Sequence, residues 1–146
     1  MTYHKPVLLE KAIEGLQVKP KGIYVDATFG GGGHSLAILK KLKPEGKLFG
    51  FDQDADSLRN NLLSHQFKLI NSNFRYIKQF LRFEGVKKVD GILADLGVSS
   101  HQFDSPDRGF SIRNKGSLDM RMSTDLAKSA IDIVNEYSQE DLAKVF

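Results

Sequence analysis

The chain has 146 residues, of which 40% are hydrophobic and 27% charged, with a formal net charge of +3. This length suits one compact domain with a hydrophobic core, and these proportions exclude an intrinsically disordered chain. There is no cysteine, which excludes disulfides and thiolate metal sites, and no apolar run near the ~18 residues that a membrane span needs. The first residues lack the basic and long apolar regions of a secretory signal, so we expect a cytoplasmic protein, and we expect no structural metal.

Strand and helix patterns alternate through the first two thirds of the chain. An amphipathic helix is expected to open it, with Pro6 at the first helical position. Strands that alternate with helices predict an α/β fold with a mostly parallel sheet flanked by helices. The expected strands are residues 22–26, 47–52, 67–71 and 89–95, and the helices between them are 35–42, 55–63 and 75–83.

The character of the sequence changes after Asp95. Residues 96–117 are rich in Gly, Ser, Pro and Asp and have neither a helical nor a strand period, so a long functional or disordered loop is expected. Two helices are predicted after it, over 125–135 and 138–146. Four strands are few for an open sheet with helices on both faces, so we expect a chain that represents part of a larger fold.

Three carboxylates stand at the carboxyl ends of expected strands, namely Asp26, Asp52 and Asp95. Ligands of open α/β sheets bind beyond this edge, so the three acids are expected to converge on one crevice. Residues 30–33 are four consecutive glycines between the first strand and its helix. Glycine has no Cβ and lets a ligand approach the backbone closely, although a loose turn is the alternative. The pattern favours a site for a nucleotide-like ligand.

Asp52 suits more than one ligand of this kind. In dinucleotide sites an acid ~20 residues after the glycine turn accepts hydrogen bonds from ribose hydroxyls. If Gly30 and Gly32 begin a G-x-G-x-x-G pattern, its third glycine position falls on Ser35, which weakens the dinucleotide interpretation without excluding it. Asp52 could instead cap the following helix, but Asp54 is better placed for that role.

Two further residues follow expected strands. Phe74 comes just after the third strand, where its ring could lie against an adenine or fill the core. Asp95 ends the fourth strand and could accept a hydrogen bond from an exocyclic amine, hold a cofactor, or order the loop that follows. The residues themselves leave these alternatives open.

Five motifs together resemble one family. They are HKPVLL at 4–9, DATFGGGGH at 26–34, DLGVSS at 95–100, RGFS at 108–111 and LDMRM at 118–122. Glycine loops are common, whereas the last three motifs in this order are specific. The sequence resembles the ribosomal small-subunit RNA methyltransferase H family, also called MraW, over nearly its whole length.

The resemblance implies a Rossmann-like class I methyltransferase that moves a methyl group from S-adenosylmethionine to N4 of a cytidine in the decoding region of 16S rRNA. The implied partner is 16S rRNA or the small ribosomal subunit, without a membrane, and a homodimer is an open expectation for the full-length enzyme. Family members are longer, so we expect a methyltransferase core at 1–122 and the start of a helical inserted domain at 123–146.

Two other functions remain open from the sequence. A cofactor-binding fragment or paralogue without independent catalytic activity is the first alternative, which the expected truncation favours and the intact motifs oppose. A nicotinamide-dependent oxidoreductase is the second, which the glycine turn and Asp52 support. The DLGVSS and LDMRM motifs oppose it.

Methyl transfer from a sulfonium is an in-line displacement that needs no metal. Asp95 is the candidate catalytic residue, because an acceptor near the weakly nucleophilic cytosine amine could orient it and receive its developing positive charge. An unpaired or flipped base is expected, and the loop at 99–117 offers Phe103, Arg108, Phe110 and Arg113 to hold it. By match to the family motifs, the cofactor contacts fall on Gly32, Gly33, His34, Asp52, Phe74, Asp95 and Gln102.

Overall fold

The computed structural model describes residues 6–146, so His4 and Lys5 of the first motif lie outside the described residues. The chain forms two compact units, Met1–Leu96 and Gly97–Phe146. The expected division after residue 122 concerns a longer protein and stays a prediction.

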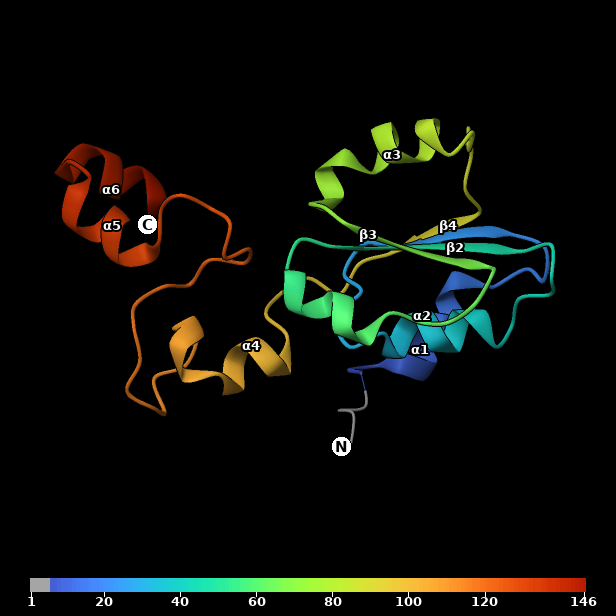
Figure 1. Cartoon of the computed structure of the whole chain (residues 1–146), viewed down its shortest axis with the longest axis horizontal. Coiled ribbons are helices and arrows are strands. Elements are labelled where there is room, and N and C mark those ends of the chain that lie inside the picture. Colours follow the sequence, from blue (N-terminus) through green and yellow to red (C-terminus); the bar gives the residue numbers. More distant parts are fainter. Residues whose placement is uncertain (1–5) are drawn as a thin grey trace. The chain divides into compact units, whose positions relative to one another are not determined.

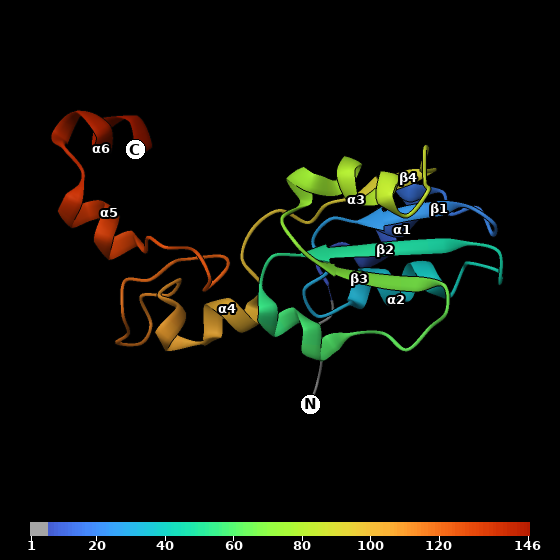
Figure 2. The same ribbon diagram turned by 45° about the horizontal axis from the view of Figure 1, so that its top comes forward.

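A four-stranded parallel sheet forms the centre of the first unit. Its strands are β1 (Ile23–Asp26), β2 (Lys47–Asp52), β3 (Phe67–Asn71) and β4 (Gly91–Leu93). They lie in the order β3-β2-β1-β4, and every neighbouring pair is parallel (Figure 2). The predicted α/β fold with a parallel sheet flanked by helices is confirmed.

Helices cover both faces of this sheet. The helices α1 (Leu9–Leu16) and α2 (Gly33–Leu39) lie on one face, and α3 (Ile77–Phe83) lies on the other (Figure 1). Two short 3₁₀ helices, η1 (Ala55–Asn60) and η2 (Phe74–Tyr76), follow β2 and β3. Each strand therefore leads into a connection that starts at the carboxyl edge of the sheet.

The two faces of the sheet carry separate apolar cores. Tyr24 and Leu48 belong to the core under α1 and α2, whereas their chain neighbours Val25 and Phe49 belong to the core under α3. All four side chains are buried. Burial on both faces is typical of parallel strands between helices, and each such side chain contributes about 1.5–3 kcal/mol.

Gly50 lets an aromatic pair lie directly against β2. The rings of Phe29 and Phe67 stack with their centroids 5.3 Å apart. A Cβ at Gly50 would lie only 2.8 Å from Cζ of Phe67, so any larger residue there displaces the pair. Because Phe29 follows β1, this packing also fixes the chain just before the glycine turn.

Two expectations for local structure in this unit are wrong. Pro6 is not the first helical residue, because Leu8 has a left-handed φ of 53° and α1 begins only after it. The helix expected over 55–63 is the shorter 3₁₀ helix η1. Helices gain most of their stability from burying an apolar face, and Leu63 at the end of this segment is fully exposed.

The second unit contains four short helical elements. They are α4 (Ser100–Asp104), the 3₁₀ helix η3 (Pro106–Arg108), α5 (Ala130–Glu136) and α6 (Gln139–Val145). The expectation that 96–117 lacks helical structure is therefore wrong. The last predicted helix is confirmed.

Side-chain caps explain where two of these helices begin. The Ser99 hydroxyl accepts the N–H of Gln102 at 3.1 Å, and the Gln102 side chain accepts the N–H of Ser99 at 3.0 Å. This capping box stabilises the first turn of α4. The N–H and hydroxyl of Ser129 both donate to Asp132, so α5 starts after Ser129 and not at the predicted residue 125.

Two properties of the described chain concern its environment and ligands. Among residues 6–146, no helix has the length and apolar character needed to cross a membrane. In the same range, no group of three or more His, Cys, Asp or Glu side chains is arranged to hold a metal ion.

Candidate cofactor site

Three strands bring acidic residues to one edge of the sheet. Asp26 ends β1, Asp52 ends β2, and Asp95 lies two residues beyond the end of β4. These strands are parallel neighbours, so their carboxyl ends meet at the same edge, where ligands of such sheets bind. The predicted strand ends at Asp26 and Asp52 are confirmed, whereas the fourth strand, expected over 89–95, ends at Leu93.

Asp26 nevertheless does not face a ligand, and that part of the expectation is wrong. Its side chain is 0% exposed, and its carboxylate accepts hydrogen bonds from the Ser35 hydroxyl at 2.7 Å and the Thr28 N–H at 3.2 Å. Burial raises the pKa of Asp26, and the Ser35 hydrogen bond opposes that rise. The carboxylate ties β1 to the first turn of α2, which explains why Ser35 stands where a dinucleotide site has glycine.

Asp52 is held by the backbone on both oxygens. Oδ2 accepts the N–H of Gly30 at 2.7 Å, and Oδ1 accepts the N–H of Asp54 at 2.9 Å. The group is half-buried, and a carboxylate oxygen can accept more than one hydrogen bond. Asp54 in turn accepts the N–H of Asp56, which confirms that Asp54 caps the following helix.

The glycine turn is fixed from two sides. Gly30 and Gly32 have φ values of 50° and 77°, in the left-handed region that favours glycine. Besides the bond from Gly30 to Asp52, the carbonyl of Gly30 accepts a hydrogen bond from Nδ2 of Asn60 at 3.0 Å. A loose turn would lack these hydrogen bonds, so the glycine turn has a fixed conformation at the carboxyl edge of the sheet.

His34 follows the turn in the first turn of α2. It is 6% exposed, and its Nε2 has no hydrogen-bond partner among residues 6–146. A buried polar atom left unpaired costs about 1–3 kcal/mol, so such atoms are rare unless a further group satisfies them. The imidazole is thus buried directly behind the glycine turn with this nitrogen unpaired.

Side chains just before Phe74 join the ends of β2 and β3. Nδ2 of Asn71 donates to the Asp52 carbonyl at 2.9 Å, and Nδ2 of Asn73 donates to Oε1 of Gln53 at 2.7 Å. Phe74 directly follows Asn73 and is 42% exposed, so it is not an ordinary core residue. Its exposed ring suits stacking against a flat heterocycle.

Asp95 presents an exposed carboxylate beyond β4. Its backbone N–H donates to Oγ1 of Thr28 at 2.7 Å. Within the described part of the chain, no hydrogen bond or ion pair engages the Asp95 carboxylate itself. The group is therefore available as an acceptor, while its backbone is fixed.

Residues that the sequence analysis missed do much of this positioning. Thr28, Asn60, Asn71 and Asn73 each hold a strand end or the glycine turn through a side-chain hydrogen bond. Only a weak pattern in the sequence indicates these roles. Asn71 and Asn73 flank the end of an apolar run, where polar side chains commonly bond to the backbone of turns.

Gln102 belongs to the second unit. It lies in α4, is 3% exposed, and uses its side-chain oxygen in the capping box with Ser99. Its side chain therefore has a local structural role. A contact with the cofactor stays a prediction.

Arg108 is also structural, and the expectation that it holds a base is wrong. It is 7% exposed, and its Nη2 donates to the carbonyls of Arg121 and Met122 at 3.0 and 3.3 Å. A guanidinium buried in this way has no exposed face for a nucleobase. The exposed Arg113 instead stacks over the ring of Phe103, with its Cζ 5.2 Å from the ring centroid.

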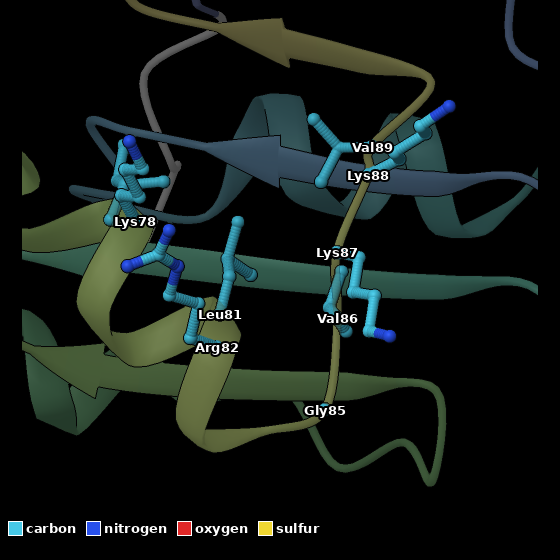
Figure 3. Close-up of a pocket in the computed structure, with 9 residues that line it drawn as sticks. Lys78, Leu81, Arg82, Gly85, Val86, Lys87, Lys88 and Val89 are labelled. Carbon is cyan, nitrogen blue, oxygen red and sulfur yellow. The ribbon is translucent and has the colours of Figure 1, made fainter.

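A separate groove of about 520 Å³ runs along α3. Figure 3 shows Lys78, Leu81 and Arg82 on the helix and Val86 and Lys87 on the segment before β4. None of the predicted cofactor residues lines this groove. It is therefore distinct from the site at the carboxyl edge of the sheet.

Comparison with known proteins gives one family. Residues 1–146 match the MraW methylase family. The chain is 63% identical to ribosomal RNA small subunit methyltransferase H of Flavobacterium johnsoniae over 146 residues, which is 100% of this chain and 48% of the relative. It is 60% identical to the protein of the same name from Christiangramia forsetii, with the same coverage of both chains.

The chain thus spans about half the length of the curated relatives it matches. A crystal structure of a protein described as a methyltransferase of an antibiotic biosynthesis pathway in Anabaena variabilis is a more distant likeness. It is 16% identical, with a TM-score of 0.46, over 69% of this chain and 37% of the other. The match over the full 146 residues establishes that the chain belongs to the MraW methylase family.

Proposed function

We propose that the protein carrying this chain is an S-adenosylmethionine-dependent methyltransferase that methylates N4 of a cytidine in the decoding region of 16S rRNA. The family match over residues 1–146 carries this proposal, and the relatives are named as small-subunit ribosomal RNA methyltransferases. The arrangement of Asp52, Phe74 and Asp95 at the carboxyl edge supports it independently.

S-adenosylmethionine supplies a methyl group on a positively charged sulfur. In the proposed site, Asp52 accepts hydrogen bonds from the ribose hydroxyls, and Phe74 covers the adenine. The backbone of Gly32 and Gly33 allows the ligand to approach closely, and His34, which follows them, is the third proposed contact of the turn. Gln102 completes the proposed contacts.

The proposed acceptor chemistry depends on Asp95. The lone pair of the cytosine amine is delocalised into the ring, so the amine is a weak nucleophile. A carboxylate beside it orients the N–H bonds and stabilises the positive charge that develops on nitrogen. Orientation of donor and acceptor can supply ~7–11 kcal/mol of the barrier, so the fixed backbone of Asp95 favours this role.

The proposal extends to partners and domain organisation. The substrate is 16S rRNA, alone or in the small ribosomal subunit, and the enzyme accordingly acts in the cytoplasm. Residues 1–122 form its methyltransferase core, and 123–146 begin a helical inserted domain. The full-length enzyme forms a homodimer in this proposal, which sedimentation of the whole protein tests.

The proposal is tested in two steps with the whole protein that carries this sequence. Calorimetric titration compares S-adenosylmethionine with NADH, and an Asp52→Ala variant provides the control. Purified small subunits that lack the modification are then incubated with the protein and labelled S-adenosylmethionine, and mass spectrometry of 16S rRNA fragments locates the label.

We expect selective S-adenosylmethionine binding that Asp52→Ala abolishes, and one labelled cytidine at N4. Selective binding without any methyl transfer would instead support a cofactor-binding paralogue without catalytic activity. Binding of NADH in place of S-adenosylmethionine would overturn the proposed cofactor. Label on a different base or position would overturn the proposed specificity.

A further inference from the structure

Thr28 continues the pairing of β1 with β4 beyond the end of both strands. The last registered pair of the ladder is Asp26 with Leu93, and the N–H of Ala27 then donates to the Leu93 carbonyl at 2.8 Å. One step further, the N–H of Asp95 donates to Oγ1 of Thr28 at 2.7 Å. A side-chain hydroxyl thus takes the place of the next main-chain carbonyl.

The backbone of Thr28 is anchored in turn. Its N–H donates to the carboxylate of Asp26, which is fully buried and also accepts the Ser35 hydroxyl. The hydroxyl of Thr28 therefore sits at a defined place relative to β1 and α2. Thr28 precedes the glycine turn, and Asp95 bears the proposed catalytic carboxylate. The hydrogen bond between them therefore connects the segment before the glycine turn to the end of β4.

We propose that Thr28 is a positioning residue for methyl transfer, which acts by holding the backbone of Asp95. This inference rests on the proposed function of Asp95. Beyond Asp95 the chain continues through Leu96 to Gly97, whose φ of 146° is open to glycine alone among common residues. The Thr28 hydrogen bond thus holds the backbone at Asp95 two residues before Gly97, and its loss removes this restraint on the position of the carboxylate.

Loss of the Thr28 hydrogen bond should lower kcat without changing the affinity for S-adenosylmethionine. Misplacement of a reacting group by about 1 Å can cost about 100-fold in rate, so a partial loss of position lowers kcat by about tenfold. The affinity for S-adenosylmethionine changes little, because the groups proposed to bind ribose and adenine are Asp52 at the end of β2 and Phe74 in η2. If the loss of the Thr28 hydroxyl only destabilised the fold, the melting temperature would fall, but kcat would not fall while the affinity for S-adenosylmethionine stayed the same.

The test compares Thr28→Val and Thr28→Ser in the whole protein. Valine keeps the shape of threonine and removes the acceptor, whereas serine keeps the hydroxyl. The matched control is Ser64→Ala, because the Ser64 hydroxyl also accepts a backbone N–H, that of Gln66 at 3.2 Å, but at the amino end of β3. Amide hydrogen exchange at Asp95, kcat and S-adenosylmethionine affinity are measured for each variant.

We expect Thr28→Val to lose exchange protection at Asp95 and to lower kcat about tenfold, with Thr28→Ser and Ser64→Ala close to wild type. In a double-mutant cycle, Thr28→Val should cost little further activity in an Asp95→Asn background. Unchanged protection at Asp95, or additive losses in the cycle, would overturn the inference. If the wild-type protein transfers no methyl group, the proposed function fails, and the exchange measurement still decides whether Thr28 holds Asp95.

Discussion

The backbone N–H of Gly30 donates to the carboxylate of Asp52 at 2.7 Å, so the acid at the end of β2 also holds the glycine turn that follows β1. One carboxylate thereby joins two neighbouring strand ends. The carboxylate proposed to bind the ribose and the glycine turn proposed to let the ligand approach the backbone are thus hydrogen-bonded to each other. A change at Asp52 should therefore affect both.

Asp52→Asn should weaken S-adenosylmethionine binding at least tenfold, or about 1.4 kcal/mol. An amide has only one oxygen, so its NH₂ group must face either the N–H of Gly30 or that of Asp54, and one acceptor for the ribose is lost. Calorimetry measures the affinity, and Asp56→Asn in η1 is the control. Equal affinities for wild type and Asp52→Asn would show that Asp52 does not bind the ribose.

Ser35→Ala should destabilise the fold by about 1–3 kcal/mol, because the buried Asp26 carboxylate loses a donor. The same change in an Asp26→Asn background should cost less, since a neutral amide is cheaper to leave unpaired than a carboxylate. Denaturant unfolding of the single and double variants measures this coupling. If the two effects simply add, the hydroxyl and the carboxylate do not stabilise each other.

Phe74→Ala should weaken S-adenosylmethionine binding while leaving the melting temperature nearly unchanged. The ring is 42% exposed, so little core packing is lost, whereas a stacked aromatic pair contributes about 0.5–1.5 kcal/mol. Phe83→Ala on α3 is the matched control, because Phe83 is 86% exposed and lies outside the proposed site. A large loss of stability in Phe74→Ala with no change in affinity would assign the ring to the core.

Much of the sheet could be predicted from the sequence, because the local apolar runs agree with the alternating order of strands and helices along the chain. The runs 47–52 and 67–71 are apolar, short and bounded by turn residues, and both are strands over those same residues. The acids that follow apolar runs mark the carboxyl edge correctly, since parallel strands share one direction. What the pattern could not separate is a buried structural acid from an exposed one, as Asp26 and Asp95 show.

The missed features depend on side-chain hydrogen bonds between distant segments. Thr28 and Asp95 are 67 residues apart in sequence, and no periodicity indicates that they meet. Arg108 looked like an exposed nucleic-acid contact but is buried against backbone carbonyls. In contrast, α4 could have been predicted, because Ser99 and Gln102 have the spacing of a capping box.

The carboxylate of Asp119 forms an ion pair with the guanidinium of Arg121. The guanidinium donates three hydrogen bonds, from Nε to both carboxylate oxygens and from Nη2 to Oδ2, and the Arg121 backbone N–H adds a fourth to Oδ1. These bonds lower the pKa of Asp119 from the ordinary 3.8 to about 2. Because the folded-state pKa is depressed, the stabilisation is fully present above about pH 4 and is lost as the pH falls from there toward 2.

Arg121→Gln should raise the pKa of Asp119 back toward its ordinary value, since the largest cause of the shift is the side-chain hydrogen bond from Arg121. An NMR titration of the Asp119 carboxyl carbon in wild type and variant measures both values directly. Arg121 also donates to the carbonyls of Thr124 and Leu126, so the variant should in addition loosen the segment before α5. A wild-type midpoint near 4, unchanged in the variant, would show that the ion pair does not form in solution.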